Sequence, residues 1–214
     1  MKKIFFYPLL WICLLQCCFP ASAQKPDTIK VRPRWEHELE ADFYFMKDEF
    51  IFLPMYKADR GWLHLEARYN YEDMNTFSAW FGYTFSGGKK FQYSITPMAG
   101  GIVGSTNGIA PGLELDFQFC GFELSSESEF VFDLQHQEDD FYYNWTDLTY
   151  APVDWLWFGL SAQRTRLYQT KMDFQHGLLL GGGYKWFGLT GYLYNPLSDD
   201  PYLLFALTFN FPEE

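Results

Sequence analysis

Basic residues and long apolar runs are both scarce in this sequence. Sixteen Lys and Arg residues stand against 27 Asp and Glu in 214 residues, a net charge of −11. Proteins that bind nucleic acid neutralise phosphates with a surplus of Lys and Arg, so that class is excluded. A helical membrane bundle needs apolar runs of about 20 residues, which the mean hydropathy of −0.20 does not suggest. Aromatic residues form 21% of the chain, whereas disordered chains contain few of them. A β-rich fold is the class of structure that remains.

The longest apolar stretch lies at the N-terminus. Lys2 and Lys3 precede the apolar residues 4–19, and three small residues follow at 21–23. This order is typical of a secretory signal peptide, and we expect residues 1–23 to be cleaved. An uncleaved anchor helix is disfavoured because the stretch is about 16 residues long and falls short of the ~20 that span a bilayer.

Cysteine is nearly absent once this leader is removed. Cys13, Cys17 and Cys18 belong to the leader, and only Cys120 remains. Lipid attachment at Cys17 or Cys18 is disfavoured, because neither follows the small residue that lipoprotein processing usually needs. A single thiol allows no intramolecular disulfide and no cysteine-based zinc site. We therefore expect Cys120 to be a small side chain beside a turn.

From residue 35 onward the dominant period is two, which is the pattern of strands with one apolar and one polar face. Turn signals separate the alternating runs, and no helical stripe competes with them. Six runs alternate strongly and six weakly, so the sequence predicts twelve antiparallel strands. The strong runs are 35–45, 63–71, 77–86, 112–119, 122–133 and 203–211, and the weak runs are 50–57, 91–103, 141–151, 156–168, 173–184 and 187–195.

The apolar face of these strands is rich in Phe and Tyr, and twelve such faces would overpack the inside of one small barrel. The volume problem disappears if the aromatic face meets lipid and the polar face meets the lumen. Closure into a barrel also pairs every backbone N–H and C=O group, as hydrocarbon demands. The predicted fold is therefore all-β, a single closed antiparallel transmembrane barrel over residues 35–211. Residues 24–34 form a tail before it and residues 212–214 a tail after it.

The terminal alternation of Leu203, Phe205, Leu207, Phe209 and Phe211, with a secretory leader and a net negative charge, resembles bacterial outer-membrane β-barrel proteins. That resemblance implies a location in the outer membrane, contact with its lipids, and an aromatic final strand that the assembly machinery reads. The sequence departs from the pattern in two places. Residues 212–214 follow the last aromatic residue, and two serines fall on the expected lipid face, where a bulge or contact with another protein would explain them: Ser126 and Ser128.

With twelve strands, both ends of the barrel segment lie on one side of the membrane, the periplasmic side in this class. The outer turns would then lie near 47–49, 72–75, 104–108, 135–140, 169–172 and 195–201. They are too short to plug a lumen, and receptor-like capture of large ligands is disfavoured.

The polar face carries acids along most of its length. Like charges about 7 Å apart on one strand face repel by about 2.4 kcal/mol at an effective dielectric near 20. The lumen must therefore hold water and cations, or keep some acids protonated, or pair them with Arg68, Arg164, Arg166 and Lys185. Glu36, Glu72 and Asp147 share this face, and the predicted lumen-lining residues are Glu38, Glu40, Asp42, His64, Glu66, Arg68, Glu114, Asp116, Glu123, Glu127, Glu129 and Asp133.

These residues predict a narrow, cation-favouring channel or porin for small cations or other small solutes, without a cofactor or metal. The alternative is a noncatalytic envelope scaffold whose lumen is filled by side chains, because twelve strands lie between filled and open barrels. A membrane-embedded lipid hydrolase using His64 is the third reading. It is disfavoured because Leu65, Glu66 and Ala67 follow His64, where outer-membrane phospholipases have a Ser-Asn-Gly stretch nearby.

Tryptophans and glycines complete the predictions. We expect Trp145, Trp155, Trp157 and Trp186 in aromatic girdles at the membrane interface. A tryptophan that faces the lumen would instead suit sugar stacking, with Trp80 or Trp157 as candidates. Strand glycines are expected to permit bulges and curvature.

Overall fold

The structure is a computed structural model and describes residues 33–165 and 174–212. The predicted leader, most of the 24–34 tail, Arg166, the expected turn at 169–172 and the last two residues lie outside this range. Within it, the regular structure is β-strand apart from one short 3₁₀ helix, η1 (Gln137–Asp139). In the described part of the chain, no helix has the length and apolarity to cross a membrane.

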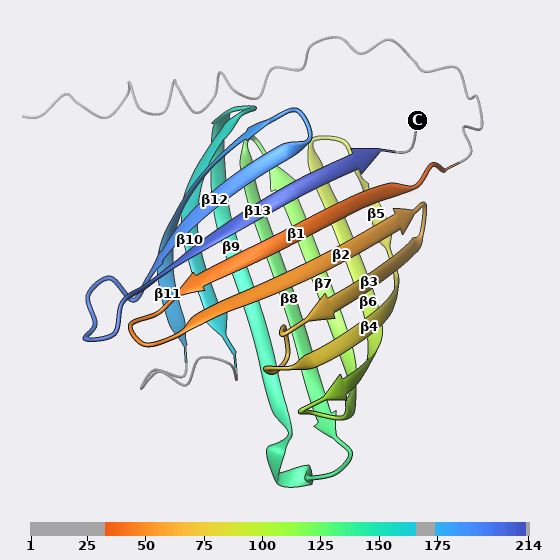
Figure 1. Ribbon diagram of the computed structural model, residues 1–214. Helices are drawn as coiled ribbons and strands as arrows, with labels where there is room; N and C mark the ends of the chain where they lie inside the picture. Colours follow the sequence, from red (N-terminus) through yellow and green to blue (C-terminus); the bar gives the residue numbers. More distant parts are fainter. Residues whose placement is uncertain (1–32, 166–173, 213–214) are drawn as a thin grey trace, which may run out of the picture. The chain divides into compact units, whose positions relative to one another are not determined.

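Thirteen strands form one antiparallel sheet that curves round and closes on itself (Figure 1). Neighbours in the sheet are neighbours in the sequence, except where the first and last strands meet and where β4 pairs with β6. The strands are β1 (Glu36–Phe45), β2 (Phe50–Arg60), β3 (Leu63–Tyr69), β4 (Thr76–Tyr83), β5 (Phe85–Gly88), β6 (Phe91–Gly104), β7 (Gly108–Phe119), β8 (Phe122–Asp133), β9 (Phe141–Val153), β10 (Leu156–Arg164), β11 (Gln175–Tyr184), β12 (Phe187–Tyr194) and β13 (Tyr202–Pro212).

Strands β4 and β5 are two parts of one spanning strand. Both pair with β6, and only Thr84 separates them. Strand β1 pairs with β2 on one side and with β13 on the other, which closes the ring. The barrel therefore has twelve spanning strands and no open edge, which confirms the predicted fold class.

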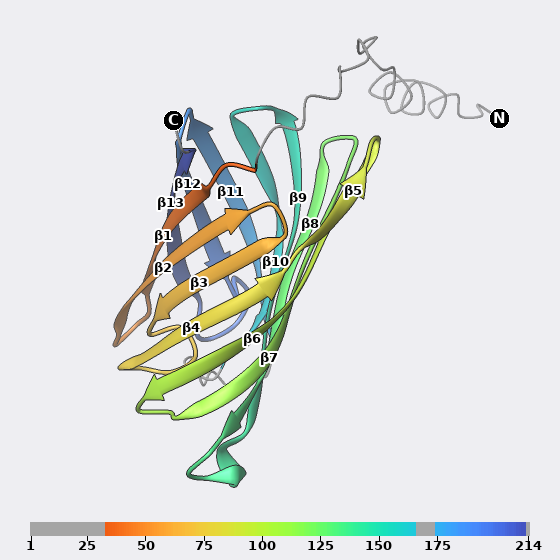
Figure 2. The same ribbon diagram turned by 90° about the vertical axis from the view of Figure 1, so that its right-hand side faces the viewer.

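Strand β1 begins and β13 ends at the same end of the barrel, which we call the terminal rim; the opposite end is the distal rim (Figure 2). Turns at the terminal rim are tight. Cys120 (φ 50°) and Gly121 (φ 80°) join β7 to β8 with two left-handed residues, the geometry of a type I′ hairpin. The hairpin of β8 and β9, which carries η1, extends furthest at the distal rim.

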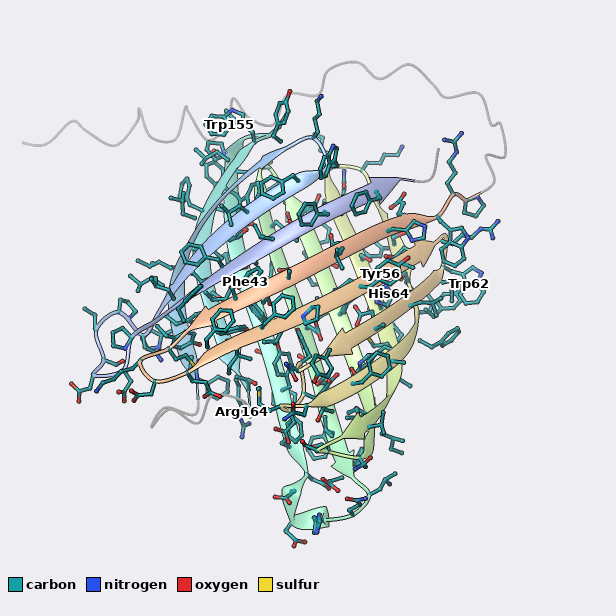
Figure 3. All side chains as sticks on the ribbon, in the orientation of Figure 1. Phe43, Tyr56, Trp62, His64, Trp155 and Arg164 are labelled. Atoms are coloured by element: carbon teal, nitrogen blue, oxygen red, sulfur yellow. The ribbon has the colours of Figure 1, made fainter. Side chains whose placement is uncertain are left out.

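The exterior of the barrel is apolar. Alternate residues of every spanning strand expose large side chains, such as Phe81 (54% exposed), Phe158 (47%) and Leu180 (62%). Figure 3 shows Phe43 and Tyr56 on the outside of the wall that β1 and β2 form. Such exposure would be unfavourable in water, and it matches the lipid-facing band of a transmembrane barrel.

Large side chains fill the barrel interior toward the distal rim. Tyr44, Ile51 and Leu204 lie side by side on β1, β2 and β13, and Tyr143 joins their cluster from β9; all four are buried almost completely. The Tyr143 hydroxyl donates to the Tyr71 hydroxyl at 2.8 Å. Inward side chains of the strands therefore fill this region.

Inward glycines make room for inward tryptophans. A Cβ atom added at Gly100 would lie 2.5 Å from the Trp80 ring, and one at Gly112 would lie 2.9 Å from it. Trp157 lies in the same way against Gly181 and Gly183. These glycines therefore act through close packing more than through the strand curvature that the sequence suggested.

The aromatic girdle prediction was wrong for two of the four tryptophans. Trp155 and Trp186 lie exposed in turns at the terminal rim, and Trp62 joins them there (Figure 3). Trp145 and Trp157 instead face the interior, where Trp157 donates to Thr190 at 3.1 Å. Their sequence neighbours carry aromatic rings on both faces, so alternation alone did not separate them.

Ser126 and Ser128 do lie on the exterior, without a bulge. The register of β8 against β7 and β9 continues unchanged through both residues. The two serines bond to polar exterior groups of β9: the Asn144 amide donates to Ser128 at 2.9 Å, and Ser126 and Thr146 share a bond of 2.8 Å. This polar ladder satisfies itself, which makes it tolerable in a lipid-facing wall.

Candidate functional site

A cavity of about 540 Å³ lies inside the barrel toward the terminal rim. It reaches that rim beside Glu36, Gly61 and Ser86, which are exposed. Nine of its twenty lining residues are charged residues or histidine: one lysine, one histidine and seven carboxylates. The charged lining residues are Glu36, Glu40, Lys57, Asp59, His64, Glu114, Asp116, Glu127 and Asp147.

Lys57 holds carboxylates from two walls of the barrel together. Its ammonium group on β2 lies 2.6 Å from Glu114 on β7 and 3.1 Å from Glu66 on β3. His64 lies beside this group, with Nδ1 2.8 Å from Asp59 and Nε2 3.0 Å from Glu66. The result is an ion-pair network across the middle of the cavity wall.

Arg68 is completely buried and forms the centre of a second network, deeper in the lumen. Its Nε donates to Glu66 at 2.7 Å, and its Nη1 lies 2.6 Å from Glu127 and 3.1 Å from Glu129. The guanidinium stacks between two aromatic rings, with its carbon 4.5 Å from the centre of one and 4.7 Å from the other: Tyr71 and Trp80. A buried charge needs this degree of pairing, because an unpaired one would be very unfavourable.

Asp147 on β9 forms the third polar group of the lumen. Its two oxygens accept from the Trp145 indole and the Tyr192 hydroxyl, each at 2.9 Å, and also from the Ser161 hydroxyl. The rings of Trp145 and Tyr192 meet edge to face at 5.6 Å. All but Ser161 line the cavity.

Beyond these networks, side chains from facing walls meet across the lumen. Tyr71 and Tyr143 share a hydrogen bond, and Gln163 on β10 donates to Tyr44 on β1 at 3.1 Å. The cavity is therefore a vestibule that opens at the terminal rim and ends at a layer of aromatic and charged side chains.

The structure places the twelve predicted lumen residues at inward positions of their strands. Five lie buried around the two networks or next to them: Asp42, His64, Glu66, Arg68 and Glu129. Six are half-buried nearer the terminal rim: Glu38, Glu40, Glu114, Asp116, Glu123 and Glu127.

The twelfth residue, Asp133, has a local role at the distal rim. Its carboxylate accepts from the backbone N–H groups of Gln135 and His136 at 2.8 and 2.9 Å. It therefore caps the turn after β8 and is separate from the cavity.

The sequence analysis missed Lys57. Strand β2 carries apolar residues on both faces, with Ile51, Leu53 and Met55 inward and Phe50 and Phe52 outward, so its period of two is weak. Lys57 and Asp59 are the polar pair of that strand. Only counting back from them in steps of two would have identified its inward positions.

The other basic residues proposed to enter the lumen do not do so where the structure describes them. The Arg164 guanidinium lies over the rings of Tyr142 and Phe174, at 5.8 and 5.7 Å from their centres, near the distal rim. Lys185 lies over the Tyr184 ring in a terminal-rim turn. Lys57 and Arg68 supply the pairing instead.

One group of donors could in principle hold a metal ion. Donor atoms of His64, Glu66 and Glu114 lie within 4.8 Å of one another. The Lys57 ammonium already contacts both carboxylates, so in this structure the group is an ion-pair network. A second group, around Asp133 and His136 in the distal hairpin, has its aspartate engaged by backbone N–H groups.

His64 has surroundings that differ from those of a serine hydrolase. In the part of the chain that the structure describes, its hydrogen-bond and ion-pair partners are the carboxylates of Asp59, Glu66 and Glu114. A nucleophilic hydroxyl would have to lie within hydrogen-bond reach of the imidazole to be activated.

Comparison with known proteins identifies the fold. No protein-family model matches the sequence, and no curated protein matches it. Two solved structures are similar: KdgM porin, with a TM-score of 0.61, and KdgM porin in complex with disordered oligogalacturonate, with a TM-score of 0.62. Each is 14% identical to this chain, and the similarity covers 81% of this chain and 99% of theirs.

At this identity the likeness concerns the fold, and it extends over nearly the whole of the described barrel. A closed barrel with an apolar exterior belongs to the outer membrane of bacteria, as the resemblance implied. The chain is an outer-membrane β-barrel of twelve spanning strands with a porin-like fold.

Proposed function

We propose that this chain is a cation-favouring channel for small solutes, with the acidic cavity as its vestibule on the terminal side. The observation that carries the proposal is the lining of that cavity, where seven carboxylates face one lysine and one histidine. Carboxylates along a narrow aqueous passage concentrate cations and repel anions. The porin-like fold supports the same function.

The charge of the cavity disfavours the kind of ligand bound in one structural neighbour. One KdgM structure is a complex with oligogalacturonate, whose uronate units are anions. An acid-lined vestibule would repel such a polyanion, because few basic groups are present to compensate. We propose that this barrel shares the fold but does not admit such polyanions.

Conduction requires a path through the layer that closes the vestibule. The contact between Tyr71 and Tyr143 and the ion pairs of Arg68 span the lumen at this layer. We propose that these side chains form the constriction, and that current flows when they separate. The narrowest point is then polar and surrounded by carboxylates, which again favours the passage of cations.

Planar-bilayer recording tests the proposal. In a KCl gradient, the reversal potential should indicate cation preference, and Glu114→Gln with Asp116→Asn should move it toward zero. Replacing Tyr71 and Tyr143 together by Ser should increase single-channel conductance, because the hydroxyl contact and both rings are removed. A correctly folded barrel that stays silent in both forms would overturn the channel.

The filled lumen also favours a second candidate, a noncatalytic scaffold barrel of the envelope. The buried cluster around Tyr44, Tyr143 and Leu204 would serve it well, because filling stabilises the wall. Silence of the Tyr71 and Tyr143 double variant would favour this candidate. Lipid hydrolysis that is lost in His64→Ala would instead establish the enzyme reading, which our proposal excludes.

A further inference from the structure

The inner end of the vestibule is a box of aromatic rings and carboxylates. Trp145 and Tyr192 meet edge to face, and both donate to Asp147. Asp147 is therefore held in a fixed orientation at the edges of the two rings. The Tyr71 ring lines the same cavity.

The barrel already uses this chemistry for its own cations. The guanidinium of Arg68 lies between the rings of Tyr71 and Trp80 and contacts carboxylates at its edge. The Lys57 ammonium sits on Glu66 and Glu114. Rings and carboxylates together are the surroundings in which proteins bind organic cations.

Two carboxylates that line the vestibule have no such cation. In the part of the chain that the structure describes, Glu40 and Asp116 form no hydrogen bond or ion pair, although both border the cavity. Glu40 projects from β1, within electrostatic range of Asp147. Behind it lies Asp42, which is 1% exposed and has an oxygen without a hydrogen-bond partner.

Asp116 stands on another wall of the cavity. It projects from β7, opposite Ser94 of β6 and Ser125 of β8, and Ser125 in turn lies opposite Asp147 of β9. The vestibule thus offers two carboxylates without a direct ion pair, one beside the aromatic box and one on another wall, both within electrostatic range of the Lys57 ammonium. Its volume of about 540 Å³ is large enough for a small organic ligand.

We propose that the vestibule binds a linear aliphatic diamine. One ammonium group would lie on Glu40 against the rings of Trp145 and Tyr192, and the other on Asp116, with the aliphatic chain between them. The inference rests on the proposed function, because it names the class of cation that the channel admits. Monoamines would engage one end only.

Isothermal titration of the folded, detergent-solubilised barrel with 1,5-diaminopentane tests the inference. Glu40→Gln and Asp116→Asn should each weaken binding by about tenfold or more, because each removes one charged contact. Asp48→Asn is the matched control, since it removes the same charge from the exposed turn between β1 and β2. Its affinity should equal that of the unchanged protein.

The outcomes separate this inference from the channel itself. If 1-aminopentane binds as tightly as 1,5-diaminopentane, or if the folded barrel binds neither, the diamine site is wrong, even where bilayer recording shows cation-selective current. Diamine binding that both variants weaken, together with a silent bilayer, keeps the site and overturns the channel. Diamine binding with diamine block of the current supports both.

Discussion

Two inward tryptophans of this barrel pack against inward glycines. Trp80 covers Gly100 and Gly112, and Trp157 covers Gly181. A large ring can lie flat against the wall only where the facing residue has no side chain. The neighbouring glycine of β6, Gly101, faces outward and has open space around its Cβ position.

This contrast gives a matched pair of substitutions. Gly100→Ala should destabilise the barrel by about 1–3 kcal/mol, because its Cβ would overlap the Trp80 ring. Gly101→Ala, one residue away, should change stability by less than about 0.5 kcal/mol. Urea unfolding in lipid vesicles measures both, and equal effects would contradict the packing account.

Arg68 is the centre of the deeper ion-pair network in the lumen. Arg68→Met should cost about 3–5 kcal/mol, because Glu129 would remain buried without its cation and Glu66 would keep only its contacts to Lys57 and His64. Arg68→Lys should restore little of this, since an ammonium lacks the planar fork that contacts several carboxylates while stacking between rings.

Arg164→Met is the control for that prediction. Its guanidinium lies against aromatic rings near the distal rim and leaves no buried acid behind. The same unfolding measurement should show a change of less than about 1 kcal/mol. A loss of stability as large as that of Arg68→Met would contradict the stabilising role given to the ion-pair network.

At the scale of the elements, strands β8 and β9 carry a polar ladder on a face that should be apolar. Asn144 is its centre, because its amide bonds to Ser126 and Ser128 and to the backbone of Glu127. The cross-strand hydrogen bonds replace the water that lipid does not supply.

The ladder predicts a non-additive response to substitution. Asn144→Leu alone should destabilise the barrel by about 1 kcal/mol, because the serines lose partners in an apolar medium. Adding Ser126→Ala, Ser128→Ala and Thr146→Val should recover part of that loss, since these polar groups no longer need partners, although the Tyr142 hydroxyl loses its bond to Ser128. Thermal or urea unfolding of the single and quadruple variants measures the difference; additive losses would show that the ladder has another purpose.

The whole molecule depends on its orientation, with an apolar exterior and a polar interior. Leu180, in the middle of β11, is 62% exposed on the lipid side. Leu180→Arg should therefore cost about 2–4 kcal/mol of folding free energy in vesicles, the range for a basic residue at the bilayer midplane.

Leu197 provides the control at this scale. It is 98% exposed but lies in the distal turn between β12 and β13, outside the strands. Leu197→Arg should be nearly neutral in the same assay. Equal costs at both leucines would place the membrane elsewhere on the barrel.

Strand positions were predictable because alternation survives wherever one face is aromatic and the other charged. Glu38 to Asp42 against Leu39 to Phe43 in β1 is such a case. Alternation failed for Lys57, Trp145 and Trp157, whose strands carry apolar or aromatic residues on both faces. A period of two cannot tell an inward ring from an outward one.

The amino-acid sequence was sufficient to specify the twelve strands, the lipid-facing side of most of them, and an interior rich in acids, because these follow from local alternation within each strand. Tertiary structure alone decided which inward groups meet: Lys57 with Glu114, Arg68 with Glu129, and Tyr71 with Tyr143. Such contacts depend on how far each strand is staggered and tilted around the closed ring, and these quantities belong to the whole barrel rather than to any single strand.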